Sequence, residues 1–500
     1  MGVFLGAYLF LIRLLGGGGL DAFCPVESDE ADYFRTLTNL IQYGPVNNGG
    51  YNGYFLNGEV FIAKFLNYSG HGFLILWPYF LMFLFLGKGF STVILSNLLL
   101  LACGFLTVYF VTNSLRKTVV VLSASLTFLP MLLFFGSFMM EVSQYFFVIV
   151  AAALLWRYQK DPSRVVGIAF VILVLAFCVI RITNVLFLIP YIVLKSHRTK
   201  RPLVCGLIMS FALLALCYGI NIATSLFMAP FPTGILYGLS AVLSEQSVLG
   251  GISFLIDHSL FNFKKLLFPF DSVHIWVIMR YVMIFLFFLF LTRGFVYYDY
   301  SQQRLFMRKA KDPVSLSFAM VAFSILGLNV VLYDLFAWRD FRVFAPFVLF
   351  FVIYIFISSR MKSIMPLIST VVLLVLLTQY NCLDNPSTQA RWTNVAYPHF
   401  ANELLYDDNP ESPWDNTILT SLSRGTDTRL MLEKDSRFGW IVALSLIDDT
   451  EGLPFGYMLL YGNSPEAYPG YELVTYEDDQ YLYKRISLIK RVSLNQTGIP

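Results

Sequence analysis

The sequence predicts an α-helical polytopic membrane protein with interfacial helices in its first long loop and a small C-terminal soluble α/β domain. The first observation is composition: 57% of the 500 residues are hydrophobic, only 13% are charged, and the mean hydropathy is +0.66. Soluble domains carry about 25% charged residues. The second is the recurrence of apolar runs of membrane-spanning length up to Tyr380, and the third is a polar, acidic composition after it.

The apolar runs predict about eleven transmembrane helices. The first, roughly residues 3–15, lacks a convincing signal-peptidase site, so we expect it to be a retained helix. The others lie near residues 90–113, 119–136, 142–157, 164–180, 183–195, 203–228, 274–293, 313–335, 341–359 and 363–380.

Charge asymmetry between the loops predicts the topology. Lys and Arg gather in every second short loop, as in Arg116-Lys117 and in the segment from Arg157 to Arg164, and such loops face the cytoplasm. The first loop (20–72), the second long loop (229–273) and the C-terminal domain are then outside. This holds if the apolar run 73–86 lies on or dips into the outer leaflet, as we expect. If that run spans the membrane, the first loop is cytoplasmic.

The first loop contains the expected interfacial helices. Ser28 to Tyr43 reads as a helix with an N-cap at Ser28 and a stop at Gly44-Pro45. Phe34, Leu37, Leu40 and Ile41 share one face, which we expect to lie in lipid. Residues 55–65 read as a second interfacial helix. The long loop 229–273 is apolar and rich in Pro and Gly, which is typical of a mobile lid or binding loop.

Two domains follow from the composition. Residues 1–380 form the membrane domain, and residues 381–500 form a soluble extracytoplasmic domain. Alternating apolar runs bounded by turn residues predict strands in the soluble domain. These runs are Thr417–Leu419, Trp440–Leu446, Tyr457–Tyr461 and Tyr481–Ile486.

Ionisable residues at membrane depth on the outer side are the candidate site residues, because charge in lipid is costly. The candidates are Asp29, Glu30, Glu141, Arg181, Arg280, Arg339 and Arg342. A structural interpretation stands beside this one. Acids after Ser28 suit a helix N-terminus, and arginines at span ends snorkel and pair with acids such as Asp340.

Several function classes are disfavoured. The net charge is +3 and the basic residues are dispersed, so no nucleic-acid partner is expected. The five histidines show no metal-binding spacing, which disfavours a histidine metal site. Neither a P-loop nor a dinucleotide-binding glycine motif is present.

Carboxylates and arginines on one membrane face suit a lipid-linked phosphate. The apolar tail stays in the bilayer, and arginine binds the phosphate through two hydrogen bonds. A carboxylate then takes the proton from an acceptor hydroxyl. Because phosphate is a good leaving group, a single displacement requires no protein nucleophile.

These residues resemble the GT-C superfamily of membrane glycosyltransferases, which includes protein O-mannosyltransferases and lipid A aminoarabinose transferases. The resemblance rests on Asp29-Glu30-x-x-Tyr33, Glu141-x-x-x-Tyr145-Phe146, Arg181-Ile182-Thr183-Asn184 and Arg342-x-x-x-Pro346. It implies inverting transfer of a sugar from a polyprenyl-phosphate donor to a hydroxyl of a glycan, lipid or protein acceptor, outside the cytoplasmic face of a plasma or bacterial inner membrane.

The resemblance also implies roles for individual residues. Asp29 would be the base, and Glu30 or Glu141 would support it or a divalent cation. Arg280, Arg342, Arg339 and Arg181 would bind the donor phosphate. The basic residue usual near the end of the first loop of this family has no clear counterpart, and Lys64 and Lys88 are the candidates.

Other functions remain open from the sequence. An O-antigen-type polymerase or ligase would share the lipid donor and outer arginines, but its chemistry would lie in a large central loop. A transporter or flippase would show paired half-helices or similar halves, and we find neither. In a structural membrane subunit the outer charges would only snorkel.

Overall fold

The computed structural model describes residues 28–43, 52–56, 59–62, 73–126, 136–195, 248–267, 296–299, 304–307, 341–358, 414–420, 439–443, 455–461, 470–477 and 480–486, with isolated positions between these ranges. The chain forms two compact units. The helical unit comprises residues 1–2, 95–223 and 233–384, and the sheet unit comprises residues 3–94, 224–232 and 385–500.

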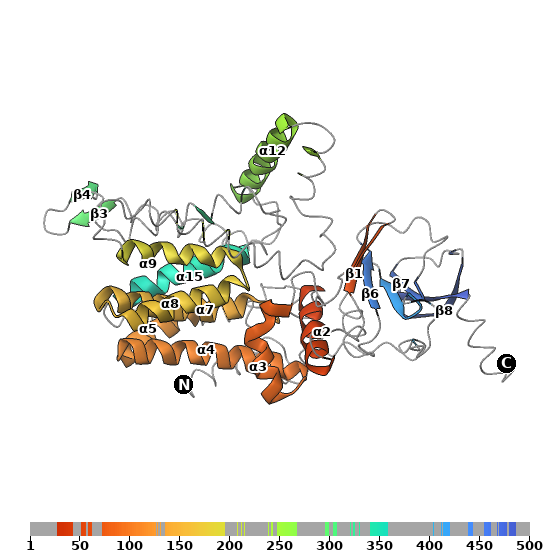
Figure 1. Ribbon diagram of the computed structural model, residues 1–500, viewed down its shortest axis with the longest axis horizontal. Helices are drawn as coiled ribbons and strands as arrows, with labels where there is room; N and C mark the ends of the chain where they lie inside the picture. Colours follow the sequence, from red (N-terminus) through yellow and green to blue (C-terminus); the bar gives the residue numbers. More distant parts are fainter. Residues whose placement is uncertain are drawn as a thin grey trace. The chain divides into compact units, whose positions relative to one another are not determined.

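A bundle of apolar helices makes up the helical unit (Figure 1). Its helices are α4 (Phe90–Thr112), α5 (Leu115–Leu126), α7 (Glu141–Lys160), α8 (Arg164–Cys178), the 3₁₀ helix η3 (Ile182–Phe187) with α9 (Leu188–Lys195), and α15 (Phe341–Ser358). Each begins or ends close to an apolar run predicted as a span. The first five residues of α4, up to Ile94, belong to the sheet unit.

Aromatic rings connect the helices of this bundle. The ring of Phe187 stacks on Phe347 at a centroid distance of 4.6 Å, and it meets Phe350 and Phe147 edge-on at 4.7 and 5.2 Å. The side chain of Phe187 is fully buried. Three elements that are distant in the sequence, α7, η3 and α15, therefore share one core.

The two ends of the bundle differ in charge. The ring contacts of Phe187 and a hydrogen bond from the Tyr354 hydroxyl to Gln159 show that α7 and α15 run in the same direction. At their C-terminal end the Lys117 ammonium lies 4.0 Å from the Trp156 ring, with Lys160 on the same ring. Partial burial, and secondly repulsion by Lys160, lower the pKa of Lys117. The two predicted loops that contain Lys117 and Lys160, both of which the charge asymmetry assigns to the cytoplasm, therefore lie at the same end of the bundle.

The outer faces of the bundle are apolar. On α8, Val165, Ile168 and Ile172 are exposed at helical spacing, whereas Phe170 and Val174 on the other side are fully buried. Exposed apolar stripes of this kind are typical of lipid-facing surfaces. Of the residues that the structure describes, α4 is the one helix with the length and apolarity of a membrane span; four further apolar helices are shorter. The expected count of about eleven is therefore not reached within this part of the chain.

The long loop predicted at 229–273 contains a regular helix. Helix α12 covers Val248–Leu267, and its exposed apolar residues Leu249, Ile252, Ile256 and Leu260 recur every three to four positions. This amphipathic periodicity explains why the segment is helical where an irregular loop was expected. A two-stranded hairpin, β3 (Val296–Asp299) with β4 (Arg304–Met307), follows in the chain.

The sheet unit is built on a seven-stranded mixed sheet with the order β2-β1-β6-β5-β7-β9-β8. The strands are β1 (Asn52–Leu56), β2 (Glu59–Ile62), β5 (Thr417–Thr420), β6 (Gly439–Ala443), β7 (Tyr457–Tyr461), β8 (Tyr471–Glu477) and β9 (Gln480–Arg485). Parallel pairs join β1, β6, β5 and β7, and antiparallel pairs form both edges. The four predicted strands are confirmed as β5, β6, β7 and β9, and β8 was not predicted.

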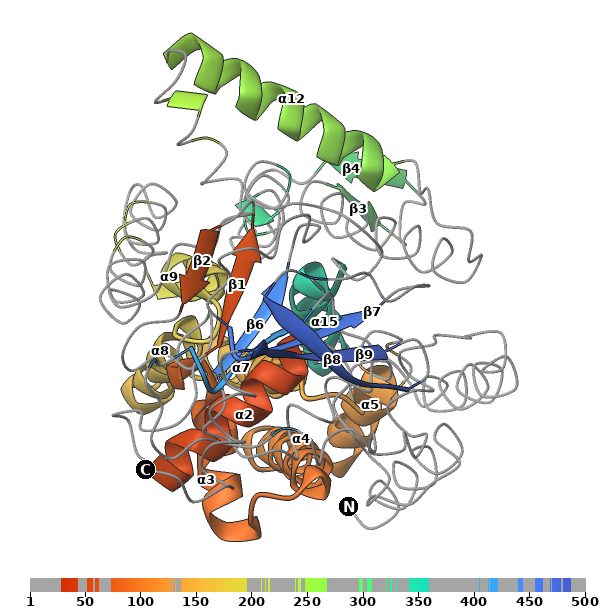
Figure 2. The same ribbon diagram turned by 90° about the vertical axis from the view of Figure 1, so that its right-hand side faces the viewer.

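The second interfacial helix predicted at residues 55–65 is wrong. Residues 55–56 instead end β1 and residues 59–62 form β2, and this antiparallel pair joins the sheet by parallel pairing of β1 with β6, as Figure 2 shows. The apolar run was read as a helix from its composition, but Tyr54, Phe55, Val60 and Phe61 are aromatic or β-branched residues that favour strands. The partner strand lies almost 400 residues away in the sequence, so no local signal indicates the pairing.

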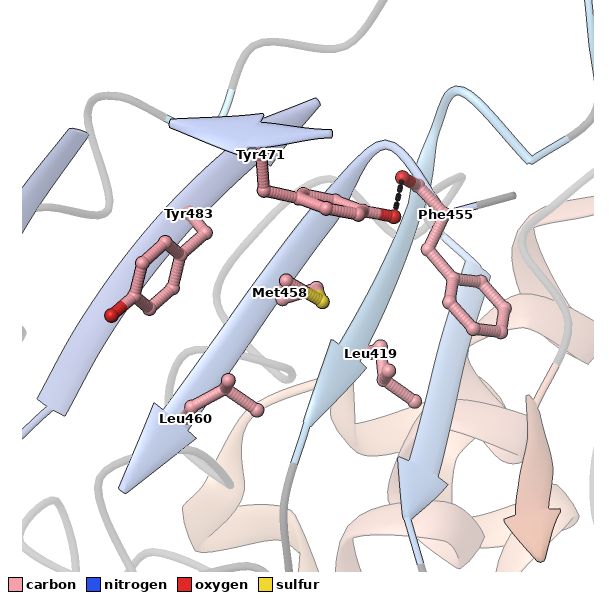
Figure 3. Close-up of a cluster of buried hydrophobic side chains, with 6 residues drawn as sticks. All are labelled: Leu419, Phe455, Met458, Leu460, Tyr471 and Tyr483. Atoms are coloured by element: carbon pink, nitrogen blue, oxygen red, sulfur yellow. Dashed lines mark hydrogen bonds between the residues drawn. The ribbon is translucent and has the colours of Figure 1, made fainter. Parts of the chain in front are cut away.

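The described core of the sheet is a compact apolar cluster (Figure 3). Its members are Leu419, Phe455, Met458, Leu460, Tyr471 and Tyr483, with Trp414, Tyr468 and Tyr481 packed against them. The Tyr471 hydroxyl donates a 2.7 Å hydrogen bond to the Phe455 carbonyl. Beside this cluster, Arg485 forms an ion pair with the buried Asp415 carboxylate.

The helix predicted at Ser28–Tyr43 is confirmed as α2, with the same bounds. The prediction that its apolar stripe lies in lipid is wrong for Phe34 and Leu37, because both side chains are buried within the protein. The Phe34 ring contacts Phe83 of α3 (Trp77–Leu86) and Phe90 of α4 at 5.7 and 4.9 Å. The burial has a simple cause: the following segment offers an apolar surface to which this stripe can pack.

Helix α3 is short for a membrane span. Ten residues extend about 15 Å, half the thickness of the hydrocarbon core. Gly87, with a φ of +89°, ends the helix, and α4 begins at Phe90. The exposed side chains of Leu81, Leu84 and Phe85 suit a helix that enters one leaflet. This agrees with the expected interfacial position of residues 73–86.

Candidate active site

Glu141 opens α7 at the end of the bundle opposite Lys117. The preceding turn is held by three hydrogen bonds: from the Asn97 amide to the Ser137 carbonyl (2.8 Å), from the Met139 N–H to the Ser137 hydroxyl (3.3 Å), and from the Ser143 hydroxyl to the Met140 carbonyl (2.7 Å). Glu141 is 2% exposed. A carboxylate in this first turn is favoured by the helix dipole.

Arg181 provides the counter-charge for Glu141. Helix α8 ends at Cys178, and the backbone at Arg181 is extended before η3 begins. This directs the guanidinium towards α7, where Nη2 donates a 2.9 Å hydrogen bond to Glu141 Oε1. Burial of an ion pair is tolerated because each charge offsets the other, and removal of one partner costs about 3–5 kcal/mol.

The pair is surrounded by buried polar atoms without a hydrogen bond. Four atoms near the pair, Arg181 Nη1, Gln144 Nε2, Thr183 Oγ1 and Asn184 Oδ1, have no partner among the described residues. Leaving one buried polar group unsatisfied costs about 1–3 kcal/mol. Such a concentration at one point in a helical bundle indicates a place that binds a polar ligand or water.

Arg342 is in the first turn of α15, and its side chain lies outside the described residues. Phe347, five positions later, stacks on Phe187, which also contacts Phe147, six positions after Glu141. The backbone of Arg342 is therefore at the same end of the bundle as Glu141, at a similar height along the helices. The structure thus brings Glu141 and Arg181 into contact and places the α15 backbone near their level.

Asp29 and Glu30 are in the first turn of α2, in the sheet unit. The Glu30 side chain is fully buried, whereas that of Asp29 lies outside the described residues. Arg35, Thr36 and Asn39 of the same helix are also buried, so α2 carries polar groups into the protein on more than one face. A helix lying on a membrane surface would expose these groups to water.

The remaining predicted residues are not brought together by the described structure. Arg280, Arg339 and Lys64 lie outside the described residues. Lys88, the other candidate for the missing basic residue, donates a 3.4 Å hydrogen bond to the Gln42 side chain on the surface.

The described residues do not fit a divalent-cation site. Among them, no group of three or more His, Cys, Asp or Glu side chains is arranged to hold a metal ion. Glu141 instead has an arginine as its immediate partner.

The sequence reasoning selected ionisable residues only, so it missed Gln144 as a site residue and named Asn184 only within the motif Arg181-Ile182-Thr183-Asn184. Asn184 Nδ2 donates to Gln144 Oε1 at 2.8 Å, directly beside the Glu141–Arg181 pair. The one available signal was their spacing: Gln144 follows Glu141 by three residues, and Asn184 follows Arg181 by three.

Comparison with known proteins finds similarity to solved structures only. No protein-family model matches the sequence, and no curated protein matches it. The chain is similar to ArnT from Cupriavidus metallidurans, in a crystal structure bound to undecaprenyl phosphate (TM-score 0.42, 12% identity, covering 96% of this chain and 97% of ArnT). It is also similar to the apo state of ArnT (TM-score 0.40, 10% identity, covering 97% and 98%).

Proposed function

We propose that this protein is an inverting glycosyltransferase that moves a sugar from a polyprenyl-phosphate donor to a hydroxyl of a glycan, lipid or protein acceptor. The reaction would take place on the non-cytoplasmic face of the membrane. Asp29 accepts the proton of the acceptor hydroxyl, whose oxygen attacks the anomeric carbon. The bond from that carbon to the phosphate oxygen breaks, and its electron pair leaves with the phosphate.

One observation carries this proposal: Arg181 is held by Glu141 through one nitrogen and has a second, buried nitrogen without a partner among the described residues. A guanidinium fixed in this way is ready to donate to a phosphate oxygen, because its orientation is already set. In the proposed mechanism Glu141 positions Arg181, and Arg181 stabilises the negative charge that develops on the leaving phosphate.

The lipid character of the donor is supported by the outer surface of the bundle. Exposed apolar side chains on α4 and α8 suit a hydrocarbon environment. A prenyl chain has the same chemistry as that environment, so only the phosphate and sugar need polar contacts. In this proposal Arg280, Arg339 and Arg342 provide further contacts to the phosphate, and Glu30 supports Asp29.

The base is tested by replacing Asp29 with Asn, which retains the side-chain shape and removes the negative charge. We expect Asp29→Asn to abolish sugar transfer in membranes supplied with polyprenyl-phosphate sugars, with a detergent melting temperature within a few degrees of wild type. Asp32→Asn, in the next turn of α2, is the matched control and should retain activity. Loss of folding in Asp29→Asn would support a capping role for Asp29 instead, and retained transfer would remove it from the mechanism.

A further inference from the structure

Two buried amides form a second connection beside the Glu141–Arg181 pair. Asn184 Nδ2 donates to Gln144 Oε1 at 2.8 Å and to the Phe177 carbonyl at 2.8 Å. Both amide side chains are fully buried. Because Gln144 is one turn after Glu141 and Asn184 is three residues after Arg181, the ionic pair and the amide pair are consecutive links between the same two segments.

The orientation of both amides is fixed by their surroundings. The Phe177 carbonyl can only accept, so the nitrogen of Asn184, not its oxygen, must face it. That nitrogen then requires the oxygen of Gln144 opposite it. Rotating either amide by 180° would place two donors or two acceptors against each other. This leaves one donor, Gln144 Nε2, and one acceptor, Asn184 Oδ1, without a partner in the described part of the chain.

One donor and one acceptor left over on two hydrogen-bonded amides favour a ligand of particular chemistry. A phosphate at neutral pH chiefly accepts, and an ammonium group only donates, so either would leave one amide atom unsatisfied. A hydroxyl does both: its oxygen accepts from Gln144 Nε2 while its hydrogen is donated to Asn184 Oδ1. Sites built to bind a hydroxyl discriminate strongly against ligands that lack it, because their buried polar atoms are then left unpaired.

We infer that the Gln144–Asn184 pair is a hydroxyl-binding subsite for the sugar of the lipid-linked donor, adjacent to the phosphate-binding Arg181. This inference rests on the proposed function. It assigns one part of the donor to the ion pair and another part to the amide pair. Arg181 binds the phosphate, which every polyprenyl phosphate carries. Gln144 and Asn184 bind a sugar hydroxyl, which only a glycosylated lipid carries.

The test compares lipids with and without a sugar. Full-length protein in nanodiscs is titrated with undecaprenyl phosphate and with its glucosyl, mannosyl and arabinosyl derivatives. We expect at least one glycosylated lipid to bind wild type at least 10-fold more tightly than the bare lipid. Gln144→Met has a similar length and removes the amide donor without adding a charge beside Arg181. It should therefore abolish this gain and leave the affinity for bare undecaprenyl phosphate unchanged.

Gln159→Met is the matched control, because it makes the same replacement on the same helix about 22 Å away. It should retain the preference for the sugar. If no glycosylated lipid binds more tightly than the bare lipid, or if Gln144→Met weakens both equally, the amides hold only water or structure, and the inference is overturned while the proposed function stands. If wild type binds none of these lipids, the proposed function fails and the inference falls with it.

Discussion

In our proposal the Glu141–Arg181 pair stabilises the fold and also binds the donor phosphate, and a single substitution would confound these two effects. Replacing Arg181 alone leaves a buried carboxylate without its counter-charge, and the resulting loss of stability would hide any effect on binding. A double replacement, Glu141→Gln with Arg181→Met, removes both charges and keeps similar side-chain volumes. Chemistry at this site should therefore be studied in the double variant.

Tyr471 provides a test of the sheet core at the level of one atom. Burial raises the pKa of its hydroxyl, opposed in part by the nearby Arg485. In the unfolded chain tyrosine ionises near pH 10, whereas in the folded sheet it stays protonated. The stability that this hydroxyl contributes is thus complete below about pH 10 and is lost as the pH rises further.

We therefore predict that Tyr471→Phe destabilises the protein by about 1–3 kcal/mol at pH 8, because the Phe455 carbonyl loses its buried donor. The difference in melting temperature between wild type and variant should narrow above pH 10. Thermal unfolding of the full-length protein at pH 8, 10 and 11 measures it. A difference that stays constant to pH 11 would show that the hydroxyl titrates as it does in the unfolded chain.

The two faces of α8 differ in what they contact. Val165, Ile168 and Ile172 are exposed, and Gly167, on the other side, is so close to Tyr191 that an added Cβ would lie 2.6 Å from its hydroxyl. The exposed face has the apolar character of a lipid-facing surface, and the opposite face packs closely against other helices. Which face meets lipid is a property of this element alone and can be measured directly.

We predict that a tryptophan at position 168 lies in the hydrocarbon region. In vesicles containing brominated lipids, the added fluorescence of Ile168→Trp should be quenched more than that of Val174→Trp, whose side chain replaces a fully buried residue. The wild-type signal from the seven natural tryptophans is subtracted. Equal quenching of the two variants would contradict a lipid-facing α8.

Several of the helices and strands whose ends or faces are marked by capping residues, turn residues or apolar alternation were predicted correctly from the sequence. Ser28 and Gly44-Pro45 bound α2, and alternation in Tyr457–Tyr461 marks β7. The same alternation in Tyr471–Glu477 could have indicated β8. Pairing over long distances could not be predicted this way: β1 pairs with β6, and Glu141 with Arg181, through geometry that only the folded chain provides. Gln144 was missed, and Asn184 was named only within a motif, because neutral residues do not stand out in an apolar sequence.

The first loop and the C-terminal segment fold together into one sheet. The register pairs Tyr54 of β1 with Val442 of β6. The loop after the first predicted span therefore cannot fold as an independent membrane-surface element. Its strands depend on residues made almost 400 positions later, which predicts that this part of the protein completes folding only after synthesis of the C-terminal segment.

Cross-linking tests this arrangement. Tyr54→Cys with Val442→Cys should form a disulfide under mild oxidation, detected by mass spectrometry of the joined peptides, because register partners in adjacent strands lie about 5 Å apart. Tyr54→Cys with Trp440→Cys, two positions out of register, is the control and should cross-link much less. Equal yields from the two pairs would contradict the parallel register of β1 and β6.

Binding of a lipid phosphate is the measurement on which the account of the whole molecule depends. The full-length protein in nanodiscs is titrated with undecaprenyl phosphate. We predict saturable binding to wild type and at least a 10-fold loss in the Glu141→Gln/Arg181→Met double variant. Arg157→Met/Asp161→Asn, which removes the exposed ion pair at the other end of α7, should bind as wild type does. Equal affinity of wild type and the Glu141→Gln/Arg181→Met variant would contradict a phosphate site at Arg181.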